Sequence, residues 1–199
     1  MGRRSIHSPE ELRQRILEAS HNIISKDGLL GLSAREIARL IGYSPGTLYN
    51  IFESLDHILL SLQVQLIGDA VAVLKAAPEN SDPNERINHL ASAYIDFALN
   101  NKRMWNVLFT HNLPTGMNAP LALHDNLNAM AAIVSEALTP LMPNASAADI
   151  DVAARTLWAS VHGISAIAVT EKGIKMTPQT AKKFVKVLTT TYANGLRCS

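Results

Sequence analysis

Cysteine is almost missing from this chain of 199 residues, which contains a single one, Cys198. One thiol cannot form an internal disulfide, so a disulfide scaffold is excluded and a reducing, cytoplasmic environment is expected. Nothing near Cys198 in the sequence would lower the pKa of its thiol, and a redox-sensing role is not favoured.

Long apolar runs are missing as well. Lys75 interrupts the richest one, residues 70–77, which is far shorter than the roughly 18 residues needed to cross a bilayer. The N-terminal segment carries positive charge, but no apolar run follows it, so it does not have the pattern of a signal peptide. No association with a membrane is expected.

The usual signatures of enzymes and metal sites are also lacking. The sequence has no phosphate-cradling glycine loop, no nucleophile elbow and no paired metal-ligand spacing among its histidines. No catalytic residue, cofactor or metal is therefore expected. The formal net charge is only +1, so a nucleic-acid partner has to be inferred from where the charges lie.

Helix-forming patterns, in contrast, fill the chain. Ser8, Pro9 and Glu11 have the spacing of a helix start with a capping box, and Ser33 with Glu36 repeats it. Apolar residues recur at helical intervals, without the alternation of strands. The expected fold class is all-α with about nine helices: an N-terminal three-helix helix-turn-helix domain over residues 1–57 and a C-terminal helical domain over residues 58–199. The later helices are expected at residues 54–76, 85–99, 102–109, 121–141, 147–170 and 178–196.

Residues 43–52, Tyr-Ser-Pro-Gly-Thr-Leu-Tyr-Asn-Ile-Phe, place a proline and a glycine at the mouth of a short helix. Ser44 is an expected N-cap, and Pro45 suits the first helical position because an N–H would be unpaired there. Leu48 and Phe52, four residues apart, are expected to anchor the helix to the core. With the short helix before it, this segment makes a helix-turn-helix.

This unit favours DNA as a partner. Helix N-termini present unpaired N–H groups and a positive dipole end to a phosphate. Thr47 and Tyr49 can hydrogen-bond phosphates, and Tyr43 and Asn50 can reach base edges. A three-helix subdomain with a solvated polar face is the alternative. The candidate DNA-binding residues are Ser33, Arg35, Tyr43, Ser44, Pro45, Gly46, Thr47, Tyr49 and Asn50.

Residues 32–38, Leu-Ser-Ala-Arg-Glu-Ile-Ala, and residues 42–52 resemble the DNA-binding domain of the tetracycline-repressor (TetR) family. The resemblance implies that residues 44–51 form the recognition helix. It also implies that Arg35 and Tyr49, together with Thr47 between them, touch DNA. In this family a larger helical domain follows, which dimerises and holds a ligand pocket.

One position departs from the family pattern. The family commonly has a lysine that meets a phosphate at the start of the fourth helix, and Leu55 stands in its place. One phosphate contact is then missing, while Glu53 and Asp56 add negative charge nearby. Weaker operator binding and compensation by an arm at Arg3 and Arg4 are both open.

The second part of the chain carries another resemblance. Residues 157–163, Leu-Trp-Ala-Ser-Val-His-Gly, look like the Trp-His-Gly signature of one subgroup of TetR-family C-terminal domains. It implies no particular ligand, and His162 is either a core histidine bonded to a backbone carbonyl or a ligand contact. The apolar residues of this part form either a cavity or a packed core. The candidate pocket residues are Tyr94, Phe97, Met104, Leu108, Met130, Trp158 and His162.

The last two expected helices each carry an apolar stripe. Together they suit a symmetric four-helix dimer interface, with packing inside one chain as the alternative. A dimer would place two recognition helices about 34–36 Å apart, which is one turn of DNA. The candidate interface residues are Leu157, Val161, Phe184, Leu188 and Tyr192.

Two functions remain from these observations. The first is a homodimeric transcriptional repressor that binds a palindromic operator in double-stranded DNA and responds to a small-molecule effector. The second is a DNA-binding protein of the same kind without an inducer, with an architectural or division-linked role. A closed, solid core in the helical domain would favour the second.

Overall fold

The computed structural model describes residues 7–170 and 176–197, and every regular element in those ranges is helical. Cys198 and the predicted arm at Arg3 and Arg4 lie outside them. The all-α prediction is confirmed, since nine α-helices and two short 3-10 turns occupy the described part.

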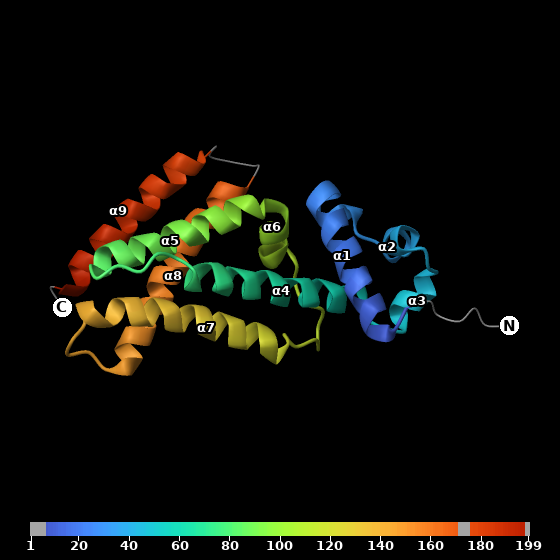
Figure 1. The fold of residues 1–199 in the computed structure, drawn as a ribbon, viewed down its shortest axis with the longest axis horizontal. Helices are drawn as coiled ribbons and strands as arrows, with labels where there is room; N and C mark the ends of the chain where they lie inside the picture. Colours follow the sequence, from blue (N-terminus) through green and yellow to red (C-terminus); the bar gives the residue numbers. More distant parts are fainter. Residues whose placement is uncertain (1–6, 171–175, 198–199) are drawn as a thin grey trace.

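The helices form an elongated molecule with a small head at one end and a larger body (Figure 1). The head contains three helices and one 3-10 turn: α1 Pro9–Asp27, η1 Leu29–Gly31, α2 Ala34–Ile41 and α3 Pro45–Tyr49. The body contains six helices and a second 3-10 turn: α4 Leu55–Lys75, α5 Pro83–Asn100, α6 Lys102–Thr110, α7 Leu121–Leu138, η2 Thr139–Leu141, α8 Ala147–Val169 and α9 Pro178–Arg197.

Local capping fixes the helix starts. Ser8 and Glu11 form the predicted capping box, with Glu11 N donating to Ser8 Oγ and Ser8 N to Glu11 Oε2 at 3.2 and 2.7 Å. Ser33 caps α2 in one direction only, because the Glu36 carboxylate pairs with Arg39 instead of returning to Ser33. The second capping box was therefore half right.

Helix α4 joins the two parts. It begins beside α1 in the head and continues into the body, where it lies along α7 (Figure 1). The predicted domain boundary at residues 57 and 58 falls in the first two turns of this helix and stays a prediction. One apolar core runs from the head into the body, and Arg103 of α6 also donates to the Ser25 carbonyl of α1 at 3.2 Å. Helix α4 and the contact of α6 with α1 thus join the head to the body.

Two helices, α4 and α8, are long and apolar enough to cross a membrane by length and composition. For α4 the apolar side chains are explained by packing, because Ile58, Leu59 and Leu62 are each at most 5% exposed. α8 buries less of its length, and its outer face is treated below.

Candidate DNA-binding head and effector cavity

The turn between α2 and α3 has the shape that a helix-turn-helix needs. Gly42 has a left-handed φ of 77°, which a residue with a side chain rarely adopts. Its N–H and that of Tyr43 both bond the Ala38 carbonyl, which closes α2. Pro45 then begins α3 as predicted.

Helix α3 is shorter than the predicted residues 44–51. Its α-helical part ends at Tyr49, and the next residues continue as a turn in which Phe52 N donates to the Leu48 carbonyl at 2.8 Å. Leu48 and Phe52 are 1% and 4% exposed, which confirms them as the anchors. Ser44 is the N-cap residue, but its hydroxyl bonds Thr47 Oγ1 at 3.0 Å instead of a backbone N–H.

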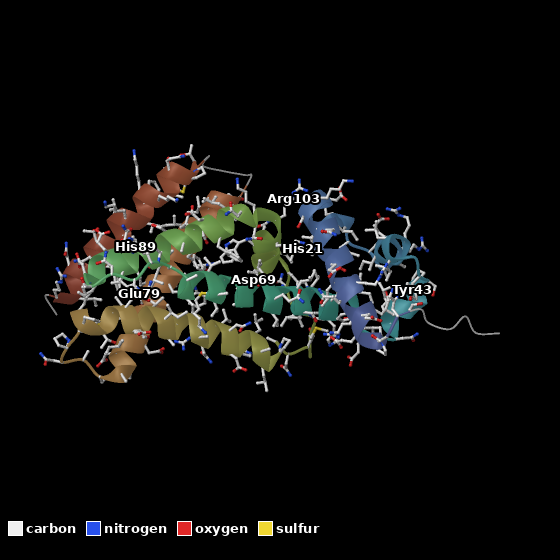
Figure 2. All side chains as sticks on the ribbon, viewed as in Figure 1. His21, Tyr43, Asp69, Glu79, His89 and Arg103 are labelled. Atoms are coloured by element: carbon white, nitrogen blue, oxygen red, sulfur yellow. The ribbon has the colours of Figure 1, made fainter. Side chains whose placement is uncertain are left out.

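The candidate DNA-binding residues share the outer surface of the head. Seven of them are exposed, and the other two, Tyr43 and Thr47, are half-buried. Tyr43 lies at the end of the molecule that α3 occupies (Figure 2). The exposed seven are Ser33, Arg35, Ser44, Pro45, Gly46, Tyr49 and Asn50.

The Tyr43 hydroxyl already has a partner inside the chain. Tyr43 Oη lies 2.6 Å from His7 Nδ1, and Arg15 donates to the other ring nitrogen of His7 at 3.2 Å. This chain of contacts holds the segment before α1 beside the turn. The Tyr43 hydroxyl therefore positions the N-terminal segment, while its ring packs against the core and lies 5.9 Å from the His7 ring.

The structure accounts for Leu55 at the start of α4. Leu55 is half-buried and packs against the core, while the Ser54 hydroxyl caps the helix by accepting from His57 N at 3.3 Å. Arg13 lies over the Phe52 ring at 4.3 Å and donates to Ser61 Oγ, which fastens α1 to the same helix. The position of the family's lysine is thus used for packing.

A cavity of about 340 Å³ lies in the body between α4, α5, α6, α7 and α8. Four of the seven candidate pocket residues line it: Tyr94, Leu108, Trp158 and His162. Sequence reasoning missed the other five lining residues, Gln63, Ile67, Leu123, Leu127 and Ala159.

The remaining three candidate pocket residues lie elsewhere. Met104 and Met130 are 3% and 0% exposed and belong to the packed core, and Phe97 packs edge-on against the Trp105 ring at 5.8 Å. None of the three lines the cavity. Apolar character could not separate cavity walls from solid core, because both are made of the same residue types.

The polar groups at the α8 side of the cavity bond to one another. Trp158 Nε1 donates to Tyr94 Oη at 3.1 Å, and Tyr94 Oη shares a hydrogen bond of 2.7 Å with His162 Nδ1. Burial raises the pKa of the Tyr94 hydroxyl and lowers the pKa of the His162 imidazole. Both groups are therefore uncharged near neutral pH. The Trp-His pair of the sequence signature forms a neutral hydrogen-bonded wall.

Acidification is expected to weaken the fold through His162. The folded-state pKa of His162 lies below its ordinary value of 6.5, so below that pH the unfolded chain binds a proton that the folded chain does not. Stability is then fully present above pH 6.5 and falls as the pH drops further. Urea unfolding at about pH 7.5 and 5.5 should show a stability difference between wild type and His162→Gln that shrinks at the lower pH. A parallel loss in both proteins would contradict this assignment.

On the α6 side, a second set of hydrogen bonds leads from the cavity to the head. Gln63 of the cavity wall donates from Nε2 to His111 Nδ1 at 3.3 Å, and His111 Nε2 donates to Asp56 Oδ1 at 2.8 Å. The His111 side chain is 8% exposed, so water competes little for these bonds. Asp56 stands in the first turn of α4, next to the head. We call these three residues the Gln63–His111–Asp56 chain.

The candidate dimer residues separate into two groups. Leu157 and Val161 are 2% and 4% exposed and pack inside the chain, so they are not available to a partner. Tyr192 is half-buried and donates to the Ala153 carbonyl at 2.8 Å, which joins α9 to α8. Phe184 is 50% exposed, and Leu188 is half-buried.

Phe184 belongs to an exposed face of α8 and α9 whose other residues were missed from the sequence. Its residues follow helical spacing on two adjacent helices, and none is charged. We call it the α8–α9 face; it consists of Val152, Thr156, Gly163 and Ile167 with Phe184, Val187 and Thr191. Val152, Ile167, Phe184 and Val187 are 64%, 45%, 50% and 67% exposed, which is unusual for apolar side chains.

Comparison with known proteins agrees with this architecture. Residues 16–62 match the model of bacterial regulatory proteins of the tetR family, and residues 87–192 match the tetracyclin repressor-like C-terminal domain. The HTH-type transcriptional regulator BetI of Rhizobium meliloti is 34% identical over 82 residues, which is 39% of each chain. The chain thus aligns with less than half the length of this curated relative.

Solved structures share the fold over nearly the whole chain. BioQ with its double-stranded DNA operator superimposes with a TM-score of 0.62 at 20% identity, covering 98% of this chain and 100% of BioQ. FadR from Bacillus subtilis in complex with stearoyl-CoA gives 0.63 at 16% identity, covering 92% and 96%. With both family models matched and the helix-turn-helix in place, the chain belongs to the TetR family of DNA-binding transcriptional regulators, which are not enzymes.

Proposed function

We propose that the protein is a homodimeric repressor that releases a palindromic operator when a small molecule fills the body cavity. The observation that carries this proposal is the position of α4. The same helix supplies Gln63 and Ile67 to the cavity wall and Leu55 and Asp56 to the border of the head. A ligand that displaces its middle also displaces the base of the DNA-binding unit.

The DNA-reading surface is the outer face of α3 with the start of α2. Tyr49, Thr47 and Ser44 bring hydroxyl groups there, and Arg35 brings positive charge. Phosphate contacts of this kind fix the protein on the duplex, while Asn50 meets base edges. A regulator that reads a chromosomal operator works in the cytoplasm.

The dimer is proposed to form through the α8–α9 face. An uncharged, partly apolar surface on two neighbouring helices matches a second copy of itself about a two-fold axis, as in a four-helix interface. A palindromic operator needs this symmetry. The alternative is a protein without an inducer, for which we expect a closed, solid core. The cavity therefore favours the ligand-responsive repressor.

The repressor proposal is tested by selecting from random double-stranded DNA with the full-length protein at low salt. Enrichment of a palindrome with half-sites about one turn apart is the expected result. Enrichment of no sequence, or of single half-sites only, would contradict it.

The Gln63–His111–Asp56 chain is proposed to carry ligand binding to the head. With a compound that releases the wild-type protein from its operator, His111→Phe should still bind the compound but release DNA poorly. The coupling free energy should fall from about 1–3 kcal/mol towards zero. The measurement compares the affinity for the compound with and without operator. His124→Phe, at an exposed histidine of α7, is the matched control and should couple normally. Equal coupling in both variants would remove the chain from the mechanism.

A further inference from the structure

The cavity walls contain no full charge. Among the described residues that line it there is no Lys, Arg, Asp or Glu, and most are apolar: Ile67, Leu108, Leu123, Leu127 and Ala159. Moving an ion from water into such walls is costly unless an opposite charge or several hydrogen bonds receive it. A carboxylate, an ammonium or a phosphate-bearing ligand finds no such partner here.

The few polar groups in the walls differ in the hydrogen bonds that they can still make to a ligand. Tyr94, Trp158 and His162 bond one another, and the lowered pKa of His162 keeps this imidazole from supplying a positive charge. The Gln63 carboxamide is 6% exposed and uses its Nε2 on His111. Gln63 lines the cavity, and its Oε1 is an acceptor without a donor among the described residues.

We propose that the effector is an uncharged, largely apolar small molecule with a hydroxyl or amide N–H that donates to Gln63 Oε1. A volume of about 340 Å³ is at the lower end of the range for small-molecule sites, so the molecule is small. The proposal rests on the proposed function, since it takes this cavity as the effector site. It adds the chemical class of the ligand and the residue that selects it.

The contact at Gln63 also explains how ligand binding is transmitted to the head. Gln63 stands at the cavity end of the Gln63–His111–Asp56 chain. A donor on Oε1 pulls the carboxamide towards the cavity, and the bond from Nε2 to His111 must lengthen or turn with it. The group that selects the ligand is thus the group that begins the signal.

Three probes of equal chain length test the class: 1-decanol, decanoate and decylammonium, titrated into the full-length protein near pH 7.5. Trp158 in the cavity wall supplies a fluorescence signal, and calorimetry gives the affinity independently. We expect decanol to bind at least tenfold more tightly than either ion. Decanoate or decylammonium binding as tightly as decanol would overturn the proposal, and so would no binding by any probe.

The variant Gln63→Leu tests the selecting residue. It should lower the affinity for decanol about fivefold or more, because the cavity loses its acceptor. Gln65→Leu makes the same change at an exposed position of the same helix and should leave decanol binding unchanged. Equal effects of the two variants, or none, would overturn the role of Gln63.

Operator selection by the same protein samples separates this inference from the proposed function. A protein that enriches a palindrome but prefers an ionic probe refutes the ligand class alone. A protein that binds decanol with the expected preference but enriches no DNA refutes the repressor and leaves the cavity assignment standing.

Discussion

A leucine in place of Gly46 is expected to weaken operator binding strongly while leaving the fold at least as stable as before. Neither backbone nor packing requires glycine at this position. Gly46 is not among the described glycines with positive φ, and an added Cβ would meet nothing closer than Ser44 Oγ at 3.9 Å. Glycine also lowers the stability of a helix by up to about 1 kcal/mol relative to other residues. Its replacement therefore costs the isolated protein nothing.

The substitution is expected to lower only the affinity for DNA. A leucine side chain at the first turn of α3 holds the backbone and the Thr47 and Tyr49 hydroxyls away from the phosphates. One hydrogen bond to a charged group contributes about 1.5–3 kcal/mol. With one lost in each head of a dimer, operator affinity should fall by about 100-fold or more.

Fluorescence anisotropy with the selected operator measures DNA affinity, and urea unfolding measures stability. Together they check that only the affinity falls. Gly46→Ala should lie between the wild type and Gly46→Leu, because the methyl group is smaller. His21→Leu is the matched control: it adds an exposed leucine on α1, on the side of the head near the body and away from Tyr43 (Figure 2). If His21→Leu weakened binding equally, or if Gly46→Leu bound normally, α3 would not be the recognition helix.

The helix boundaries could be predicted because their causes are local. Ser8 and Ser54 cap their helices where the sequence indicated it by accepting from an N–H three residues away, and Pro45 begins α3 through its own fixed φ. The predicted helix at residues 102–109 is observed at Lys102–Thr110. A side chain that caps its own helix needs no knowledge of the rest of the fold.

The cavity and its polar connection could not be predicted because their causes are distant in the chain. His111 meets Gln63 and Asp56 across 48 and 55 residues. No periodicity links these positions, and all three residue types are common on solvated surfaces. Only the packing of α6 against α4 brings them together.

The dimer residues show a different limit of sequence reasoning. α8 is apolar on two sides, and a pattern of apolar residues does not say which side faces its own chain. Leu157 and Val161 fill the interior, and Val152 and Ile167 lie on the exposed side. Because the stripes have similar composition, three-dimensional burial was needed to distinguish them.

Glutamate in place of Val187 is expected to separate the dimer and to remove operator binding with it. Val187 is 67% exposed in the single chain and lies on the α8–α9 face. About a two-fold axis the change enters the interface twice, so two unpaired carboxylates are buried near each other. Each costs several kcal/mol when it loses its water without a partner. The dimer dissociation constant should rise by at least about 100-fold, which sedimentation equilibrium measures.

Ala132→Glu is the control because it places the same charge on an exposed residue of α7, a helix that does not contribute to the α8–α9 face. This variant should remain dimeric and bind DNA normally. Val187→Glu monomers should retain the helical content and the cavity of the wild type, since Val187 does not belong to the core. Their affinity for a palindrome should nevertheless be low, because each monomer binds its half-site alone. A dimeric Val187→Glu protein would exclude the α8–α9 face as the interface and leave the two-fold symmetry to another surface.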